Sequence, residues 1–527
     1  MNSPRLLTTP AAEAYAYPLL IRQLLANVAD QSRAEIVSGD LRLSYREFVA
    51  RVGRLASMLA ARGVRAGDTV AVMDWDSHRY LECYFAIPMM GAILQTVNVR
   101  LSSAQIEFTL RQSGASFLLR NADFSVSCAA LLPRLPQVRE VVVMSGPAGE
   151  DDYETLLAES DPAFPFVDFD ENAIATTFHT TGTTGDPKQV FFTHRQLVLH
   201  TLALAASLAN QPDGQGMRRS DVYMPMTPMF HVHAWGMPYV ATMLGAKQVY
   251  PGRYDPAVLL ALKRREGVTL SHCVPTILRM LLDADRADAA GEGSLSPWTV
   301  VIGGAALPAA LAQEARQAGI TPVVGYGMSE TGPVIALARE EEGAGEPRCR
   351  AGFPIPLVHA RCDEANGGEL VLRAPWLTQG HAIQAASDDL WAGGWLHTGD
   401  VAQADADGAL RIVDRLKDVI KSGGEWVSSV ELEDLLTAEP EIVEAAVIGV
   451  PDPKWGERPA AFVVAAETLD PMHVCARLQR HVASGRISRY AVPERLLVVD
   501  SLPRTSVGKI DKKALRILFE AQAARLD

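Results

Sequence analysis

The stretch from His179 to Val190, with the sequence HTTGTTGDPKQV, concentrates hydroxyls, two glycines and one lysine in a short loop. Gly182 and Gly185 let the backbone approach an anion closely, and backbone N–H groups and threonine hydroxyls can donate hydrogen bonds to it. Lys188 adds a positive charge. These residues predict a phosphate-binding loop, although a surface turn rich in glycine and threonine is the alternative. The spacing of the common nucleotide-triphosphate loop is absent.

Two elements must position this loop. The run 173–178 before it is rich in β-branched residues, and the run from Thr193 to about Asn210 has helical character. We therefore expect a strand, the loop and then a helix.

A second candidate is the segment Gly325–Gly332, which follows the apolar pair Val323 and Val324. Glu330 could hold a hard cation through its carboxylate, and Thr331 could donate to a phosphate. Tyr326 could stack on a base. The alternative is a turn at a strand end with a solvated glutamate.

Acidic and basic residues recur later in the chain. Asp400 ends a predicted strand, which is a usual position for accepting hydrogen bonds from ribose hydroxyls, although an aspartate more often caps a turn. Arg415 could give a second contact to the ribose or a phosphate, or else form a salt bridge. Gly423 and Gly424 admit a narrow ligand or form a simple turn. The loop 503–508 ends in Lys509 and could carry that charge into a site, unless it is only a solvated basic loop.

Composition limits the class of protein. The chain has 527 residues, 48% of them hydrophobic, and a formal net charge of −13. This acidity argues against nucleic acid or an anionic membrane surface as the main partner. No apolar run approaches the roughly 20 residues of a membrane span, and residues 1–17 lack a secretory pattern. The six cysteines are scattered without metal-ligand spacing. We expect a soluble, cytoplasmic protein.

Up to about residue 354, helices alternate with short apolar strands. This alternation predicts parallel sheets covered by helices on both faces. The predicted helices are 45–61, about 80–90, 256–266 and 308–318, and the predicted strands are 68–73, 92–94, 117–119, 141–144, 247–250, 268–270, 298–302 and 323–324.

The character of the chain changes after about Pro354. Short strands at 369–372, 394–397 and 409–413 predict a small β-rich unit. A dense charge run begins at Asp414, where we place a domain boundary. Beyond it, helices at 430–437 and 471–482 and strands at 445–450 and 460–465 predict a compact α+β unit.

Together, in this order and at these separations, the stretches resemble the adenylate-forming superfamily of acyl-CoA synthetases, adenylation domains and luciferases. The resemblance covers nearly the whole chain. The segments 228–235 (PMFHVHAW) and 417–426 (KDVIKSGGEW) look like the branch that activates fatty acids. The resemblance implies an ATP- and acyl-binding domain over 1–413, a hinge at 414–419 and a mobile C-terminal domain over 420–527.

The resemblance also implies residue roles. The ATP-binding set would be Thr180, Thr181, Gly182, Thr183, Thr184, Lys188, Gly303, Gly304, Gly325, Tyr326, Thr331, Asp400 and Arg415. Glu330 and Thr183 would hold Mg²⁺. His231, Trp235, Gly327 and Met328 would border the acyl pocket. Lys417 would be the hinge residue and Lys509 the adenylation lysine, while Lys421, Gly423 and Gly424 would serve the thioester-forming state.

Two departures from the family pattern stand out. Gln189 replaces the small residue that usually follows the loop lysine. The segment 358–396 is short, and its run 380–384 (GHAIQ) lacks the usual tyrosine and acidic residue.

The predicted function is an ATP-dependent acyl-CoA ligase for a medium- to long-chain fatty acid, acting through an acyl-AMP and releasing AMP and pyrophosphate. ATP, Mg²⁺ and coenzyme A follow from the resemblance, and a homodimer is compatible with it. Alternatives are loading of a carrier protein's phosphopantetheine, or a CoA ligase for a short, branched, cyclic or thioether acid. A nucleotide-binding module without turnover is a third reading, which retention of Lys509, Glu330 and Asp400 disfavours.

Overall fold

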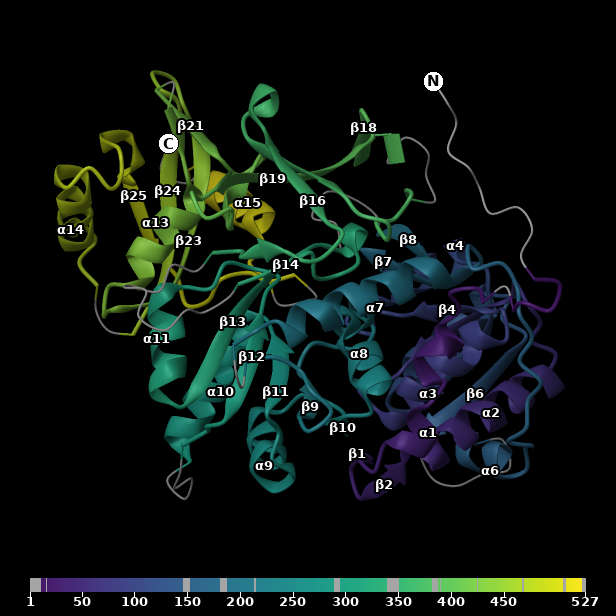
Figure 1. Ribbon diagram of the computed structural model, residues 1–527. Coiled ribbons are helices and arrows are strands. Elements are labelled where there is room, and N and C mark those ends of the chain that lie inside the picture. The colour runs from purple at the N-terminus through teal and green to yellow at the C-terminus, as the bar shows by residue number, and fades with distance from the viewer. Residues whose placement is uncertain are drawn as a thin grey trace.

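A computed structural model describes residues 11–15, 17–145, 152–180, 187–212, 215–288, 294–338, 350–381, 387–388, 390–423, 425–466, 469–505 and 509–523. A large α/β part carries a β-rich unit and a small C-terminal α+β unit, as Figure 1 shows. The predicted fold class is confirmed. Thr181, Gly182, Thr183, Thr184 and Gly424 lie outside the described residues.

The large part contains two sheets. The six-stranded sheet has the order β6 (Glu140–Ser145), β5 (Ala115–Asn121), β3 (Thr69–Met73), β4 (Ile93–Thr96), β7 (Ile174–Thr180) and β8 (Lys188–Thr193). The nine-stranded sheet has the order β15 (Phe353–Pro354), β14 (Ala336–Leu337), β13 (Ile320–Tyr326), β12 (Trp298–Ile302), β11 (Leu270–Cys273), β9 (Val222–Pro225), β10 (Lys247–Tyr250), β1 (Glu35–Ser38) and β2 (Leu41–Ser44). The inner strands of both sheets pair in parallel, whereas antiparallel pairs lie toward the edges.

The helices of the large part pack on these sheets. They are α1 (Val28–Gln31), α2 (Tyr45–Ala61), α3 (His78–Met89), α4 (Ser103–Gln112), α5 (Ser125–Leu131), α6 (Tyr153–Ala158), α7 (His194–Ala209), α8 (Met237–Leu244), α9 (Pro256–Glu266), α10 (Pro275–Ala287) and α11 (Ala309–Gln317). α2 begins at the predicted residue because Ser44 and Glu47 form a capping box. α7 and α8 place side chains in both main apolar cores of this part, so they join the two sheets.

Two local predictions were wrong. The run 188–193 is a strand, β8, so the Thr/Gly loop joins two antiparallel strands rather than a strand and a helix. Gln189 and Val190 point to opposite faces of the strand and both are buried, whereas Lys188 is exposed; Thr193 then caps α7. The strand expected at 268–270 lies at Leu270–Cys273.

The two remaining sheets follow each other along the chain. The β-rich unit contains β16 (His359–Asp363), β17 (Glu369–Arg373), β18 (Trp391–Ala392), β19 (Trp395–Ala404) and β20 (Leu410–Arg415). The C-terminal unit contains β21 (Ile420–Ser422), β22 (Glu425–Val427), β23 (Ile442–Asp452), β24 (Gly456–Ala465) and β25 (Arg495–Val498), with α13 (Ser429–Thr437), α14 (Pro471–Ala483) and α15 (Lys512–Ala523). The chain passes from the sheet of the β-rich unit to that of the C-terminal unit between Arg415 and Ile420. The expected domain limits and the hinge at 414–419 stay predictions.

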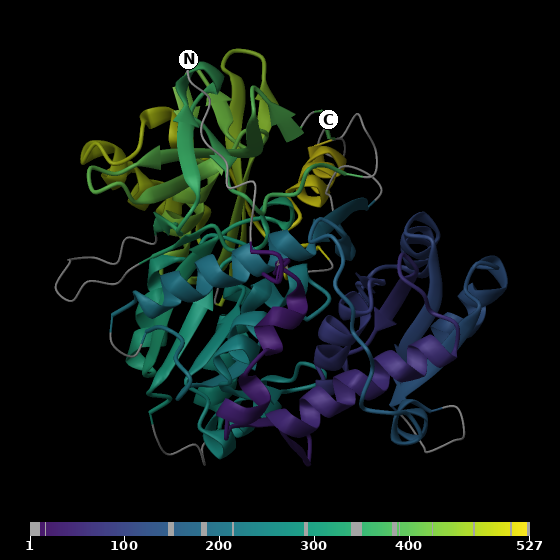
Figure 2. The ribbon, with the colours of Figure 1, turned by 45° about the vertical axis from the view of Figure 1, so that its right-hand side comes forward.

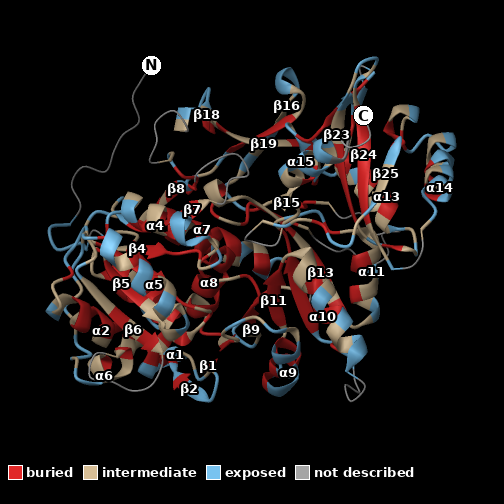
Figure 3. Ribbon diagram, turned by 180° about the vertical axis from the view of Figure 1, so that it is seen from behind, coloured by how far each residue is buried: buried red, intermediate tan, exposed pale blue. Residues whose placement is uncertain are grey.

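The C-terminal unit lies over the large part at the end where β11, β12 and β13 finish (Figures 1 and 2). The Asp434 carboxylate accepts a bond from the backbone of Ala309, and the Arg504 guanidinium donates to the Thr276 hydroxyl at 2.8 Å. Burial follows the strands, which Figure 3 shows as continuous buried bands within the large part and the C-terminal unit. The carboxyl ends of these strands are therefore covered by the small unit, and such ends are where ligands bind in open α/β sheets.

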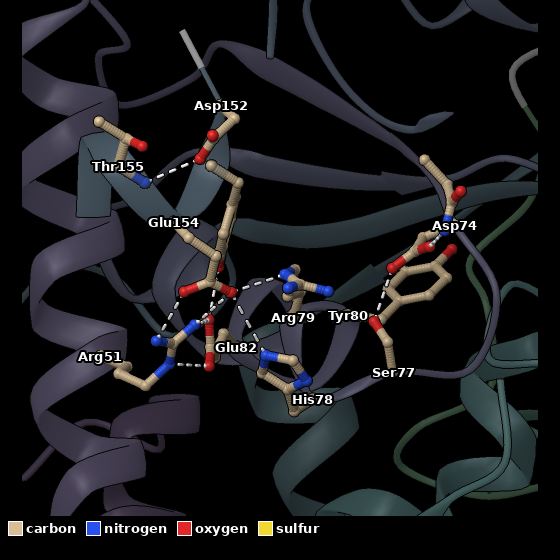
Figure 4. A network of polar contacts seen from close by, with 12 residues as sticks. Arg51, Asp74, Ser77, His78, Arg79, Tyr80, Glu82, Asp152, Glu154 and Thr155 are labelled. Carbon is tan, nitrogen blue, oxygen red and sulfur yellow. Dashed lines mark hydrogen bonds and ion pairs between the residues drawn. The ribbon is translucent and has the colours of Figure 1, made fainter. Parts of the chain in front are cut away.

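A buried ion-pair network fixes three helices of the N-terminal region (Figure 4). The Arg51 guanidinium of α2 donates to Glu82 of α3 at 2.6 Å and to Glu154 of α6 at 2.9 Å. Arg79 adds a bond to Glu154, and the Tyr153 hydroxyl donates to Glu82 at 2.6 Å. Glu82 is fully buried, so its charge depends on these partners.

We expect Glu82→Ala to lower the free energy of unfolding by about 3 kcal/mol, because it leaves buried donors of Arg51 and Tyr153 without their acceptor. Asp30→Ala, which breaks the exposed pair with Arg46, should cost less than about 1 kcal/mol. Urea unfolding of both variants measures the difference. Equal losses would contradict a structural role for the buried network.

Candidate active site

Glycines at the carboxyl ends of β12 and β13 bring three segments together. A side chain at Gly303 would overlap the Gly325 carbonyl and lie 3.2 Å from Cη2 of Trp235. Gly304, with φ of +77°, faces Lys509: a Cβ there would lie 3.5 Å from the lysine Cε and 4.0 Å from Nζ. Both positions therefore need glycine, and together they join Trp235, the end of β13 and Lys509.

Lys509 reaches this position from the C-terminal unit. Its backbone is held by Thr505, whose N–H donates to the Lys509 carbonyl at 2.7 Å and whose hydroxyl accepts from the Lys509 N–H at 3.2 Å. Burial lowers the pKa of the Lys509 ammonium to about 8, and Arg415 lowers it further in the same sense, while Asp400 and Glu330 act to raise it. Lys509 thus lies within the electrostatic field of Glu330 of the large part and of Asp400 and Arg415 of the β-rich unit.

Asp400 and Arg415 occupy paired positions on β19 and β20. The Arg415 Nε lies 3.6 Å from Asp400, and the Tyr326 hydroxyl donates to the other oxygen of the carboxylate at 2.6 Å. Burial raises the pKa of the Asp400 carboxyl, and Arg415, Tyr326 and Lys509 oppose that rise. The structure therefore brings together the three residues that the sequence suggested for the nucleoside.

Glu330 lies on the 3₁₀ turn η5 (Ser329–Thr331), which follows β13. Burial raises the pKa of its carboxyl, whereas the charges of Lys188, Lys509 and Arg415 lower it. The side chain is 12% exposed, and Nε2 of His381 lies 3.8 Å from it. One partly accessible carboxylate among three cations suits a metal–phosphate group, because Mg²⁺ is commonly held by one or two carboxylates plus substrate phosphates. The described residues contain no group of three or more metal-ligating side chains.

Thr331 differs from its neighbours in this turn. Its side chain is fully buried, and its hydroxyl donates to the Met328 carbonyl and accepts from the Met328 N–H, both at 3.0 Å. Ser329, on the same turn, is partly exposed. The sequence suggested Thr331 as the phosphate donor and passed over Ser329, although both hydroxyls flank Glu330.

The described ends of the Thr/Gly loop are Thr180 and Lys188, which face each other across β7 and β8. Lys188 is exposed, and its charge acts on Glu330. Gln189 points into the hairpin, where its amide donates to the Thr177 hydroxyl at 3.1 Å. The unusual glutamine is thus a packing residue of β7 and β8.

The predicted acyl-pocket residues lie on two segments. Trp235 belongs to a turn, η4 (Val232–Gly236), whose residues have left-handed backbone angles, and its ring lies 5.1 Å from that of His272. Burial, followed by the charges of Lys509 and Arg100, lowers the pKa of His231 to about 3. Gly327 packs against the Pro333 carbonyl, and Met328 is partly exposed. Trp235 therefore reaches the site beside Gly303, and His231 lies within the field of Lys509.

The residues expected to serve the second half-reaction lie elsewhere. Lys421 is on β21, where its backbone N–H donates to Glu457 at 2.9 Å and its ammonium lies 5.6 Å from the centre of the Trp426 ring. Gly423 faces Trp455 and Tyr490. Lys417 lies in the turn between β20 and β21 and is exposed. These partners of Lys421 and Gly423 all belong to the C-terminal unit.

The arrangement of sheets and site is that of AMP-binding enzymes. The sequence profile of the AMP-binding enzyme family matches residues 25–381, and that of the AMP-binding enzyme C-terminal domain matches residues 431–509. The chain belongs to this family, and within it to the AMP-forming acid–CoA ligases, which bind ATP and an acid. The recognition made from the sequence is confirmed.

Three similar proteins illustrate the relationship. A long-chain-fatty-acid–CoA ligase of Thermus thermophilus is 40% identical over 92% of both chains. A 3-methylmercaptopropionyl-CoA ligase of Ruegeria lacuscaerulensis is 37% identical over 95% of this chain and 98% of its own. The crystal structure of ATP-bound MatB from Rhodopseudomonas palustris superimposes with a TM-score of 0.82 at 25% identity, over 95% of this chain and 99% of that one. In the part of the chain that the structure describes, no helix is long and apolar enough to cross a membrane.

Two residues near the site escaped the sequence analysis. His381 forms an isolated bridge with Val190 and lies beside Glu330. From the sequence, the segment 380–384 stood out only because it lacks the usual tyrosine and acidic residue. Asp76 belongs to none of the sequence motifs, and it accepts a hydrogen bond from the Met229 N–H just before the turn that carries Trp235. The sequence signal for both was weak, because only the fold brings them toward the site.

We expect a pH dependence that originates in Lys509. Its ammonium is the useful form beside anions, and its pKa of about 8 means that kcat/KM for pyrophosphate release should fall as the pH rises through that value. In Lys509→Arg the guanidinium stays protonated well above this range, so the residual activity should lack the decline. An identical decline in both proteins would assign it to another group.

Proposed function

We propose that this enzyme activates a medium- to long-chain fatty acid and transfers the acyl group to coenzyme A through an acyl-AMP. The observation that supports the chain length is the surroundings of Trp235. Trp235 belongs to an apolar cluster with Leu204, Val301 and Val334 and is 6% exposed. Its ring lies next to Gly303, and the following residue, Gly304, faces Lys509. An apolar wall beside the lysine suits an acid whose tail is hydrocarbon.

In the first half-reaction, a carboxylate oxygen of the acid attacks the α-phosphorus of ATP and pyrophosphate leaves. Negative charge accumulates between two anions, so electrostatic stabilisation is the main requirement. The Lys509 ammonium would supply it at the carboxylate and the bridging phosphate oxygen. Asp400 and Arg415 would hold the ribose, with Tyr326 fixing the Asp400 carboxylate. Thr180 to Thr184 and Lys188 would cradle the β- and γ-phosphates.

Glu330 would hold Mg²⁺, which when bound neutralises phosphate charge. The accessibility of Ser329 and the burial of Thr331 favour Ser329 as the α-phosphate donor, since Thr331 already closes its own turn with both bonds of its hydroxyl. Thr331 would then maintain the geometry of the turn that carries Glu330.

In the second half-reaction, the thiolate of coenzyme A attacks the acyl carbon and AMP leaves. Lys421 and the pair Gly423 and Gly424 would serve this step after the C-terminal unit turns about Lys417. The different surroundings of the two lysines support this division, because Lys421 contacts Glu457 and Trp426 of the C-terminal unit whereas Lys509 faces Gly304 of the large part.

The relatives suggest the competing acids. One is a long-chain fatty-acid ligase, and the other acts on a short thioether acid. The short segment before the hinge disfavours a carrier protein as acceptor. The second candidate function is therefore a CoA ligase for a short or thioether acid, in which Trp235 would close the pocket.

We expect kcat/KM to rise with chain length across straight-chain acids of two to sixteen carbons, because each buried methylene contributes about 0.8 kcal/mol. AMP formation with and without coenzyme A is the measurement. Trp235→Ala should move the preference toward bulkier acids and leave the KM for ATP unchanged. A maximum on acids of four carbons or fewer, or on 3-methylthiopropanoate, would favour the second candidate.

Lys509→Ala should lower acid-dependent pyrophosphate release by at least about 10²–10³, the usual loss on removing one preorganised donor. Conversion of supplied acyl-AMP and coenzyme A to thioester should stay near that of the natural enzyme. Lys421→Ala should show the reverse pattern, which makes it the matched control. Equal impairment of both steps by either variant would contradict the assignment of Lys509 to adenylation and Lys421 to thioester formation.

A further inference from the structure

The turn that carries Trp235 has an unfavourable backbone. Val232, His233, Ala234 and Trp235 have φ between +47° and +58°, and Gly236 follows at +75°. For residues with a side chain, left-handed helical geometry costs roughly 1–2 kcal/mol per residue. Such strain persists only where the surrounding structure determines the backbone, and it tends to occur at functional sites.

Inside the protein, one side of the turn is enclosed by aromatic rings. The His233 ring is 1% exposed and lies 5.4 to 6.3 Å from the rings of Phe178, Tyr84, Tyr239 and Phe192. This cage holds the middle of the turn. His231 and Trp235 flank His233 and are the residues that approach the site.

Three buried polar side chains bond to the backbone just before the turn, and a fourth, partly buried one supports them. Asp76 accepts from the Met229 N–H at 2.8 Å and from the Tyr254 hydroxyl at 2.6 Å. The Tyr84 hydroxyl donates to the Met229 carbonyl, and the Thr96 hydroxyl donates to the Phe230 carbonyl at 3.0 Å. Three of these bonds join a residue distant in sequence to three consecutive peptide groups, and the fourth, from Tyr254, holds the Asp76 carboxyl. We call these four residues (Asp76, Tyr84, Thr96 and Tyr254) the turn clamp.

Burial of the Asp76 carboxyl costs free energy that apolar packing does not explain. Asp76 is 2% exposed, and burial raises the pKa of its carboxyl to about 7 against the hydrogen bonds from Tyr254 and Met229. A buried carboxylate without a paired cation is stabilised chiefly by such donors. Its neighbour Asp74 is equally buried, and its carboxylate accepts from the Ser77 hydroxyl, the Asn121 amide and the Trp75 N–H (Figure 4 shows the bond to Ser77). None of these bonds reaches Met229, Phe230 or the turn.

We propose that the turn clamp is a set of positioning residues for acid selection: Asp76 and Thr96 fix the peptide groups of Met229 and Phe230, and thereby hold Trp235 and His231 in the strained turn at the acyl side of the site. The inference rests on the proposed acyl pocket. The clamp residues need not touch the acid. They set how closely the Trp235 ring approaches Gly303, and so how tightly the pocket distinguishes one acid from another.

The test compares two matched pairs of variants. Thr96→Val removes the hydroxyl that donates to Phe230 at nearly constant volume, and Thr69→Val removes a buried hydroxyl of β3 that donates to Ser113. Asp76→Ala removes the acceptor for Met229, and Asp74→Ala removes its neighbour. Asp76→Asn keeps one acceptor and should restore part of the effect. Readouts are the ratio of kcat/KM for two acids that differ by several methylenes, the KM for ATP and the melting temperature.

We expect Thr96→Val and Asp76→Ala to change the acid ratio by about 10-fold, the effect of misplacing roughly one methylene's contact, with the KM for ATP unchanged. Thr69→Val and Asp74→Ala should lower the melting temperature comparably and leave the ratio alone. If Asp76→Ala does not fold, Thr96→Val decides. A lowered melting temperature with an unchanged ratio in the clamp variants would overturn the inference.

Trp235→Ala separates this inference from the proposed pocket. If Trp235→Ala shifts the acid ratio but the clamp variants do not, the clamp is structural only and the inference falls. If the clamp variants shift the ratio but Trp235→Ala does not, the clamp acts through another part of the turn, and the proposed role of Trp235 in the acyl pocket is wrong. If none shifts the ratio, both fall.

Discussion

The approach of the Lys509 ammonium to the paired glycines after β12 is the interaction on which the rest of the site depends. It requires two positions without side chains, Gly303 and Gly304, and it places a partly desolvated cation between Asp400, Glu330 and Arg415. It also requires the C-terminal unit to lie over the strand ends, held there by the bond between Asp434 and the Ala309 backbone and by the bond between Arg504 and Thr276. The pKa of the ammonium is lowered because the strand ends exclude water, and that exclusion makes the charge effective on a substrate.

Elements with strong periodicity were predictable from the sequence, and the site was partly so. The helices 45–61 and 256–266 are found at the predicted residues because a capping box or an N-terminal Asp–Pro pair marks where each begins. Asp400 and Arg415 meet because β19 and β20 pair at these two positions, and Tyr326, at the end of β13, reaches Asp400 from another sheet. β8 was missed because it begins with the polar residues Lys188 and Gln189 and shows no strict alternation of exposed and buried residues. Burial of Gln189 depends on a partner, Thr177, on the neighbouring strand.

The contacts that sequence patterns could not supply are those between distant segments. Asp76 lies more than 150 residues before Met229, and His381 comes beside Glu330 only because a single bridge aligns it with Val190. The left-handed turn was equally hidden, since Val232, Ala234 and Trp235 are residue types that disfavour positive φ. Local propensity predicts the opposite conformation there, and tertiary bonds override it.

The two helices α7 and α8 have a consequence for how the large part unfolds. Each contributes side chains to the core of the six-stranded sheet and to that of the nine-stranded sheet, so neither core can be solvated without exposing the other. Cooperative units of folding follow such shared burial rather than sheet boundaries. The two sheets therefore form one cooperative unit, while the C-terminal unit, with its own apolar clusters, can open by itself. Damage far from the nucleotide, in the N-terminal helices, would lower the population of intact sites without altering the chemistry of any molecule that remains folded.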